Sequence, residues 1–270
     1  MKNIFAVAHL TLKEGLGQKI LYSVLILALM VIFFAVLLSG FFMRDIAKII
    51  IDFSLAAVSL GGLLVPFLIT VNLVAGDLEN RTIFSLLAAP LPRSAYITGK
   101  FIGLGLLAGV IMLILSSAGL LAVWAGKMLY GVHFFKMFSP ASYITAVFMN
   151  YMAVLLLNSL VILWCCLTNS SFLVTLLTIA SYLIGQTIDD IVMFISAPNS
   201  GVPLSHSIKI TISIAKYIFP NLAAFDFKQM AAHGLHIPWS DTITMTAYAM
   251  VYSITALSLA IIIFQRRDLP

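Results

Sequence analysis

Between Lys19 and Arg44 the chain reads ILYSVLILALMVIFFAVLLSGFFM, residues 20–43, without one charged side chain. The hydrocarbon core of a bilayer is about 30 Å thick, and an α-helix needs roughly 20 apolar residues to cross it. A charge at the centre of such a helix costs about 2.5–3.5 kcal/mol, so membrane spans exclude charges. The 24 uncharged residues predict a first membrane span, and they are too many for the apolar core of a cleaved signal peptide.

Further uncharged intervals follow along the chain. Their lengths are 24 residues for 53–76, 26 for 101–126, 52 for 137–188 and 24 for 242–265. The 52-residue interval is too long for one span, and the polar residues 168–171 divide it into a tight hairpin of two. We therefore expect six spans, near residues 20–43, 53–75, 101–126, 144–167, 171–195 and 244–264.

The composition agrees with this reading. Of the 270 residues, 62% are hydrophobic and 9% are charged, and the mean hydropathy is +1.11, whereas an ordinary soluble domain is about a quarter charged. So few charges cannot cover a water-exposed surface. This excludes a soluble enzyme, a disordered chain and a nucleic-acid-binding domain. We predict an all-α membrane protein with a single domain over residues 1–270.

An even number of spans places both termini on the same side. With cytoplasmic termini, eight Lys and Arg residues lie inside and seven outside, and three of those seven fall in the long 196–243 connection, where the positive-inside rule is weaker. Four of the five arginines also lie inside. We therefore expect a multi-pass protein of the bacterial cytoplasmic membrane with both termini in the cytoplasm.

Two segments outside the spans have their own patterns. Residues 2–18 predict an amphipathic interfacial helix, because Phe5, Ala8, Leu12 and Leu16 recur at helical spacing. The connection 196–243 carries prolines and aromatic residues that suit the outer headgroup region. Within 204–219 an alternating pattern resembles a strand, but a lone strand in lipid leaves its backbone unpaired, so we expect a helix there.

The loop between the second and third spans, residues 76–100, contains a short charged segment. Asp77 and Glu79 stand where carboxylates favour a helix N-terminus, and Pro90 ends that helix. The ordered set of residues that follows Asp77 is Glu79-Asn80-Arg81-Thr82, Leu86-Leu87, Pro90, Arg93 and Gly99-Lys100. A short helix fixed between two spans can transmit force to both.

This ordered set resembles the first cytoplasmic loop of type-2 ATP-binding-cassette permeases, and in particular the branch associated with multicopper-enzyme maturation. The resemblance extends over the whole chain, through the leader helix, the six spans, the long outer connection and the Arg-Arg-Asp-Leu tail at 266–269. Pro220-Asn221, Phe225-Asp226 and Gly234 also resemble that branch. Many relatives carry a second arginine before Arg-Thr, where this chain has Asn80.

The resemblance implies the permease subunit of an exporter, whose loop docks in a cleft of a separate ATPase present in two copies. It implies no cofactor in this chain, because ATP and Mg²⁺ are bound by the ATPase. It further implies a second permease copy as a homodimer partner, contact with membrane lipid and an accessory protein on the periplasmic side, but no nucleic acid. The residues expected to couple to the ATPase are Asp77, Glu79, Arg81, Thr82, Arg93 and Lys100. Alternatively, Arg93 and Lys100 anchor the third span at the headgroups.

Polar residues within the spans form two stripes at helical spacing. Ser59 and Thr70 belong to one stripe in the second span; the other, in the fifth span, consists of Thr178, Tyr182, Gln186 and Asp189. Polar groups in a span face protein or water rather than lipid. Both stripes are candidates for the translocation path, and hydroxyl-mediated helix packing explains them equally well.

Three other features admit more than one interpretation. The G-x-x-x-G spacings of Gly99, Gly103, Gly105 and Gly109 favour packing within one subunit over a dimer seam. His233 and His236 have a spacing that binds metal in some proteins, but solvated loop histidines are the better reading. Two rival functions are a polytopic membrane enzyme acting on lipid or peptide and an ion-coupled secondary transporter, and Asp189 is the residue on which either would depend.

Overall fold

The structure is a computed structural model that describes residues 2–17, 20–41, 45–75, 92–168, 170–196, 215 and 218–266. Within these ranges the secondary structure is helical, and no strand is present. Six helices are long and apolar enough to cross a membrane, as expected for a multi-pass membrane protein. Their bounds are α2 Ile20–Ser39, α3 Ile46–Thr70, α6 Arg93–Tyr130, α7 Pro140–Leu167, α8 Ser171–Ser196 and α11 Trp239–Arg266.

The predicted number of six long apolar helices is confirmed. Two helices begin earlier than the predicted spans: α3 at Ile46 rather than near residue 53, and α6 at Arg93, so residues 93–100, which we assigned to the loop, belong to the helix. Pro92 immediately precedes it with an extended backbone, as expected for a residue that cannot donate a main-chain hydrogen bond. The predicted coupling helix itself, within residues 76–91, lies outside the described residues.

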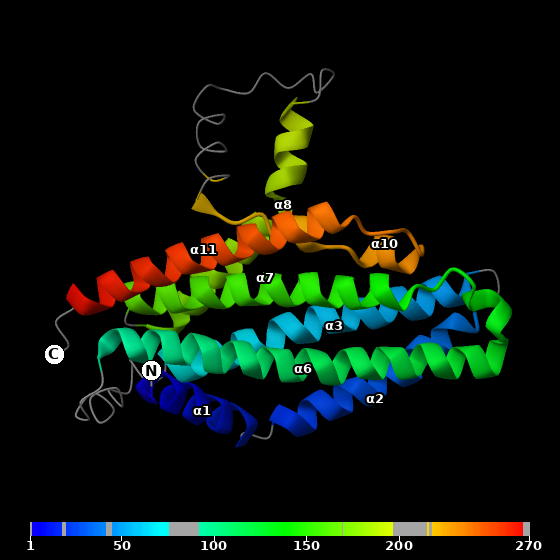
Figure 1. The fold of residues 1–270 in the computed structure, drawn as a ribbon, viewed down its shortest axis with the longest axis horizontal. Helices are drawn as coiled ribbons and strands as arrows, with labels where there is room; N and C mark the ends of the chain where they lie inside the picture. Colours follow the sequence, from blue (N-terminus) through cyan, green and yellow to red (C-terminus); the bar gives the residue numbers. More distant parts are fainter. Residues whose placement is uncertain are drawn as a thin grey trace.

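Helices α3, α6 and α7 form the centre of the bundle. Between 56% and 61% of their span residues are buried, against 28% for each of α2, α8 and α11. In Figure 1 these central helices run side by side along the long axis, with α1 near one end and α10 near the other. We call these the α1 end and the α10 end of the bundle.

Helix α1, Lys2–Gly17, packs on the first turns of α6 at the α1 end (Figure 1). The predicted leader helix is therefore present, and three residues of the expected face, Ala8, Leu12 and Leu16, pack against the core. Val7, Ala8 and Thr11 are buried, whereas Phe5 is 66% exposed. The small residues face α6 because they allow the two helices to approach closely, as described below.

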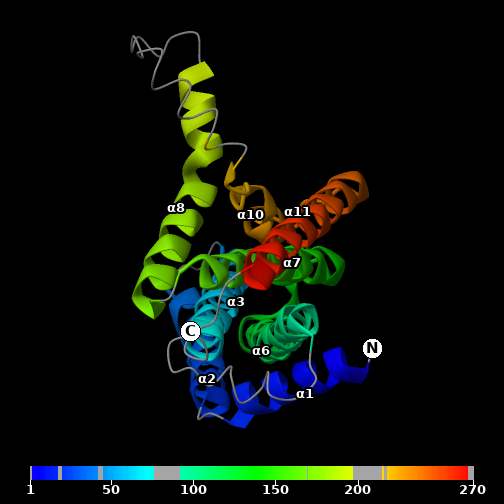
Figure 2. The ribbon, with the colours of Figure 1, turned by 90° about the vertical axis from the view of Figure 1, so that its left-hand side faces the viewer.

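Helix α8 is inclined steeply to the other long helices. Figures 1 and 2 both show that its C-terminal half leaves the bundle and projects beyond α7 and α11. Ile191 and Met193 are exposed in that half, and large apolar side chains of the N-terminal half are exposed as well, among them Leu176, Ile179 and Leu183.

The connection that precedes α11 is described from residue 218 onward, together with residue 215. Residues 197–214, 216 and 217 lie outside the described residues, and they include most of the segment 204–219 in which we expected a helix. It contains the short helices η3, Ala223–Phe225, and α10, Lys228–Ala232. We expected its aromatic residues at the membrane surface, but Phe225 and Phe227 are buried within the protein. Helix α10 packs on α3 and α7, and this contact closes the α10 end of the bundle.

Candidate functional site

The contact between α1 and α6 is made backbone to backbone. A Cβ atom added to Gly99 would lie 2.6 Å from the Cβ of Val7, and one added to Gly103 would lie 2.7 Å from the carbonyl oxygen of Ala8. Two glycines one turn apart thus form the seat on which α1 rests. The sequence prediction that these glycines pack within one subunit is confirmed for this pair.

Lys100 and Arg93 link the start of α6 to its neighbours. The Nζ of Lys100 lies 3.6 Å from a carboxylate oxygen of Glu14 on α1, and Lys100 is only 3% exposed. The guanidinium of Arg93 donates from Nη1 to the carbonyl oxygens of Phe264 at 2.9 Å and Gln265 at 3.1 Å, at the end of α11. The last carbonyl groups of an α-helix lack partners within that helix, and a cation beside them also favours the helix dipole.

The α1 end is consequently one joined unit of three helices. Tyr96 adds to it by stacking on the Phe264 ring, with the ring centroids 6.1 Å apart. Of the two coupling residues that are described, Lys100 is covered by α1 and Arg93 is bound to α11. Both side chains therefore make their contacts within the bundle. The other four expected coupling residues, Asp77, Glu79, Arg81 and Thr82, lie outside the described residues.

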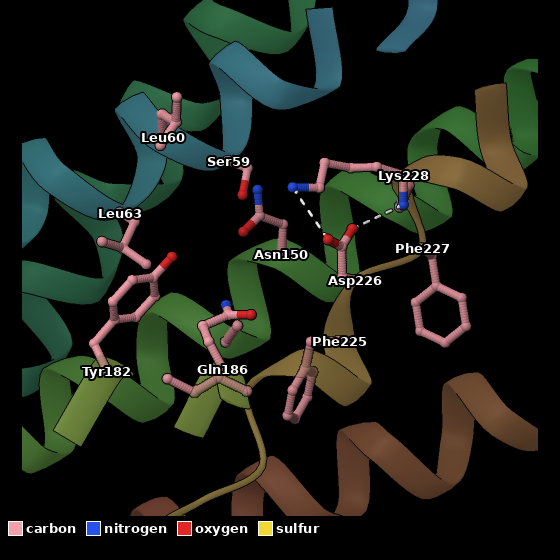
Figure 3. A pocket seen from close by; sticks show the side chains of 13 residues that line it. Ser59, Leu60, Leu63, Asn150, Tyr182, Gln186, Phe225, Asp226, Phe227 and Lys228 are labelled. Carbon is pink, nitrogen blue, oxygen red and sulfur yellow. Dashed lines mark hydrogen bonds and ion pairs between the residues drawn. The ribbon is translucent and has the colours of Figure 1, made fainter. Parts of the chain in front are cut away.

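A cavity of about 110 Å³ lies between α3, α7, α8 and the connection before α11. Figure 3 shows the polar ends of Ser59, Asn150, Tyr182 and Gln186 turned toward it from three different helices. Within the described residues, no hydrogen bond occupies the side chains of these four residues. A cavity lined by several open donors and acceptors is suited to hold a polar ligand.

Asp226 and Lys228 complete this cavity on the side of the connection. The Nζ of Lys228 lies 3.1 Å from Oδ2 of Asp226, and the main-chain N–H of Lys228 donates to Oδ1 of the same carboxylate at 3.1 Å (Figure 3). The pair is partly exposed, with 42% of the Asp226 side chain and 29% of the Lys228 side chain accessible. The cavity thus carries one charge of each sign.

The structure brings together only part of the two predicted stripes. Ser59, Tyr182 and Gln186 line the same cavity, although they come from spans two and five. Thr178 does not line this cavity; it is buried, and its hydroxyl donates within α8 to the carbonyl oxygen of Val174 at 2.8 Å. Thr70 is likewise buried, and its hydroxyl donates at 2.7 Å to the carbonyl oxygen of Pro66.

Asp189 holds the connection to α8. Its carboxylate accepts a hydrogen bond from the side-chain amide of Asn221, and one residue later the N–H of Leu222 donates to the carbonyl of Gly185 at 2.9 Å. Within the described residues no group of three or more His, Cys, Asp and Glu side chains is close enough to hold a metal ion. His233 contacts the carbonyl oxygen of Gln229 through Nδ1 at 2.9 Å.

The connection also reaches the middle of α11. The hydroxyl of Tyr252 donates to the carbonyl oxygen of Ile218 at 2.7 Å, and that of Tyr248 accepts from the N–H of Asn221 at 3.2 Å. Ile218 and Phe219 border a second, mainly apolar cavity of about 290 Å³ together with Trp164 near the end of α7. Non-helical backbone at this position is tolerated because side chains satisfy its polar groups.

The predicted site did not include four polar residues that the structure brings to prominence: Asn150, Asn158, Asp226 and Lys228. Asn150 and Asn158 stand out as amides within an apolar run, so this signal was present in the sequence. Asn158 is 1% exposed and its Oδ1 lies 3.2 Å from the Thr70 hydroxyl, which shares its one proton with the carbonyl oxygen of Pro66, while the amide nitrogen of Asn158 has no partner among the described residues. No such signal marks Asp226 and Lys228 as cavity residues, because their place at the cavity depends on how the connection folds back.

Helix α3 changes its geometry beside this Thr70–Asn158 contact. Pro66 lies inside the helix and cannot donate a main-chain hydrogen bond, and after Thr70 the chain continues as a π-helix, η1, over Val71–Ala75. Such π-turns are often found at functional sites. The segment that precedes residues 76–91 is therefore the least regular part of α3.

Comparison with protein-family models finds no match, and comparison with curated proteins finds none either. The functional assignment therefore depends on the sequence pattern and on the geometry given above.

Proposed function

We propose that this chain is the permease subunit of an ATP-binding-cassette transporter, an exporter in which two permeases form the path and two separate ATPases supply the work. The proposal begins from the order of motifs in residues 77–100, which resembles that of such permeases. The six apolar helices are compatible with it. The observation that carries it furthest is the joined α1 end, because it lies directly after the segment where an ATPase would act.

A push on residues 76–91 would reach α6 at its first residue, Arg93. From there the hydrogen bonds to Phe264 and Gln265 would carry the displacement to α11, and the Lys100–Glu14 pair would carry it to α1. On the other side of the loop, α3 contains Pro66, which lacks a main-chain donor, and is followed by the π-helix η1; both features make this segment easier to bend. The loop therefore joins a braced helix to a bendable one.

Such bending would alter the polar cavity. Ser59 lies about two helical turns before Pro66 on α3, and the other cavity residues lie on α7, α8 and the connection. A change in the direction of α3 would move one wall of the cavity relative to the others. We infer that this cavity is part of the substrate path, which keeps the predicted roles of Ser59, Tyr182 and Gln186.

The test is co-purification of the tagged full chain in mild detergent, followed by an assay of ATP hydrolysis. We expect an ATPase in equal amount. Glu79→Ala and Arg81→Ala should release it, because the family resemblance implies that these residues make the contact. Lys100→Met should retain the ATPase but reduce the effect of the permease on its rate of ATP hydrolysis, since methionine fills the buried site without pairing with Glu14.

Lys127→Met is the matched control, because Lys127 lies in the last turn of the same helix at the opposite end. It should leave both binding and hydrolysis unchanged. If no nucleotide-binding protein co-purifies under several gentle conditions, the proposal is wrong.

A further inference from the structure

The polar cavity is lined by both polar and apolar side chains. Its open hydrogen-bonding groups belong to Ser59, Asn150, Tyr182 and Gln186, but Leu60 and Leu63 also line it. Leu60 is the first of three exposed leucines that follow one side of α3 at four-residue spacing. Their exposed fractions are 59% for Leu60, 49% for Leu64 and 54% for Leu68. An apolar strip therefore leads away from a polar cavity, toward the α1 end.

The charges at the cavity suit a ligand that is itself zwitterionic. The carboxylate of Asp226 has about four acceptor sites, of which the Lys228 ammonium and the Lys228 N–H occupy two. The ammonium of Lys228 has three donors, of which Asp226 takes one. Both charges thus retain capacity for a second partner, and neither sign is in excess.

We propose that this cavity binds the head group of a phosphatidylethanolamine molecule, with an acyl chain along Leu60, Leu64 and Leu68. The ligand's ammonium donates to Asp226, and its phosphate accepts from Lys228 and from the amides of Asn150 and Gln186. If the bound lipid is also the exported substrate, that role rests on the proposed function. The binding itself does not, because every residue involved belongs to this chain.

The same geometry predicts a preference among lipids. Phosphatidylcholine has the phosphate but no N–H to donate to Asp226, and phosphatidylglycerol has the phosphate but no cation. Each lacks one charge-assisted hydrogen bond that phosphatidylethanolamine makes, and the loss of one such bond corresponds to about a tenfold weaker affinity. The expected order places phosphatidylethanolamine first by about that factor.

The experiment is native mass spectrometry of the purified, delipidated full chain in detergent. The three lipids carry identical acyl chains and are added one at a time, and soluble phosphoethanolamine is added in a fourth series. We expect phosphatidylethanolamine adducts at about tenfold lower lipid concentration than the others. Asp226→Asn should remove the advantage over phosphatidylcholine, and Lys228→Gln should weaken all three lipids.

Asp45 and Lys48 supply the matched control. They form an ion pair of the same length, 3.1 Å, at the start of α3 and away from this cavity. Asp45→Asn and Lys48→Gln should leave the lipid preference unchanged. If Asp226→Asn does not fold, Gln186→Leu provides a second test, because it removes a phosphate donor without altering a charge.

The outcomes separate the alternatives. Equal binding of all three lipids, or an equal effect of the control pair, overturns the proposal. Binding of soluble phosphoethanolamine as tight as that of the lipid overturns the role of the leucine strip. Because no ATPase is present, failure here leaves the permease proposal standing, and failure of co-purification leaves the lipid site standing.

Discussion

Gly103 on α6 and Ala8 on α1 approach so closely that a Cβ atom on the glycine would lie 2.7 Å from the alanine carbonyl oxygen. The neighbour in this contact is main chain, which cannot swing away as the end of a side chain can. The position of α1 is therefore fixed by the absence of a side chain at residue 103. This makes α1 part of the folded bundle and allows its role to be tested by single substitutions.

Gly103→Val should displace α1 from α6. Overpacking of a closed contact costs about 1–3 kcal/mol, so we expect a lower melting temperature in detergent and faster amide hydrogen exchange over residues 2–17. Gly109→Ala is the control, because an added Cβ there meets only Tyr151, at 3.6 Å or more. Unchanged exchange in the Gly103 variant would show that α1 is held elsewhere.

Arg93→Lys should loosen the end of α11 without changing the charge. Lysine cannot reproduce the placement of the guanidinium Nη1 between the carbonyls of Phe264 and Gln265. The loss of a charged hydrogen bond predicts roughly tenfold faster exchange in the last turn of α11. Arg266→Lys is the control in the same turn, since Arg266 is exposed. Equal effects of the two changes would contradict the linking role of Arg93.

The six spans could be predicted because charges are costly within a bilayer, so their spacing along the sequence marks the helices directly. The role of Arg93 could not be predicted in this way. Its partners are carbonyl groups at the end of α11, and main-chain atoms leave no trace in residue identity. The sequence marked Arg93 as a charge beside a span but could not say what it contacts.

Only some residues of the candidate cavity could be predicted from the sequence. Tyr182 and Gln186 share a side of one helix, and helical periodicity is sufficient to pair them. Asp226 joins them only because the connection folds back along α7 and α8, where Leu222 bonds to Gly185. That path is a tertiary property. Thr178 belongs to the same stripe but does not line this cavity, and its hydroxyl bonds within its own helix.

Thr70 and Asn158 should show strong energetic coupling. Thr70→Val removes the donor to Asn158, whose amide nitrogen already has no partner in the described part of the chain, and a buried unpaired group costs about 1–3 kcal/mol. The double variant Thr70→Val, Asn158→Leu should regain most of that stability, because both polar partners are then absent. Thermal unfolding of the two single variants and the double variant gives the coupling energy.

Thr175→Val is the control for this cycle. Its hydroxyl donates only to the carbonyl oxygen of Ser171 within the same helix, at 2.8 Å. It should change stability equally in the presence and absence of Asn158→Leu. Additive effects of Thr70→Val and Asn158→Leu would mean that the contact between them contributes little.

Tyr248→Phe and Tyr252→Phe should release the connection from α11 at two different points. Tyr248 accepts from the N–H of Asn221 and Tyr252 donates to the carbonyl of Ile218, so each substitution removes one hydrogen bond from the main chain of the connection. Tyr248→Phe should raise exchange at the Asn221 amide by roughly tenfold, whereas the Leu222 amide stays protected by Gly185 of α8. Tyr22→Phe, at a side chain 70% exposed, is the control. Equal exposure of both amides would show that the connection moves as one piece and that α11, rather than α8, holds it.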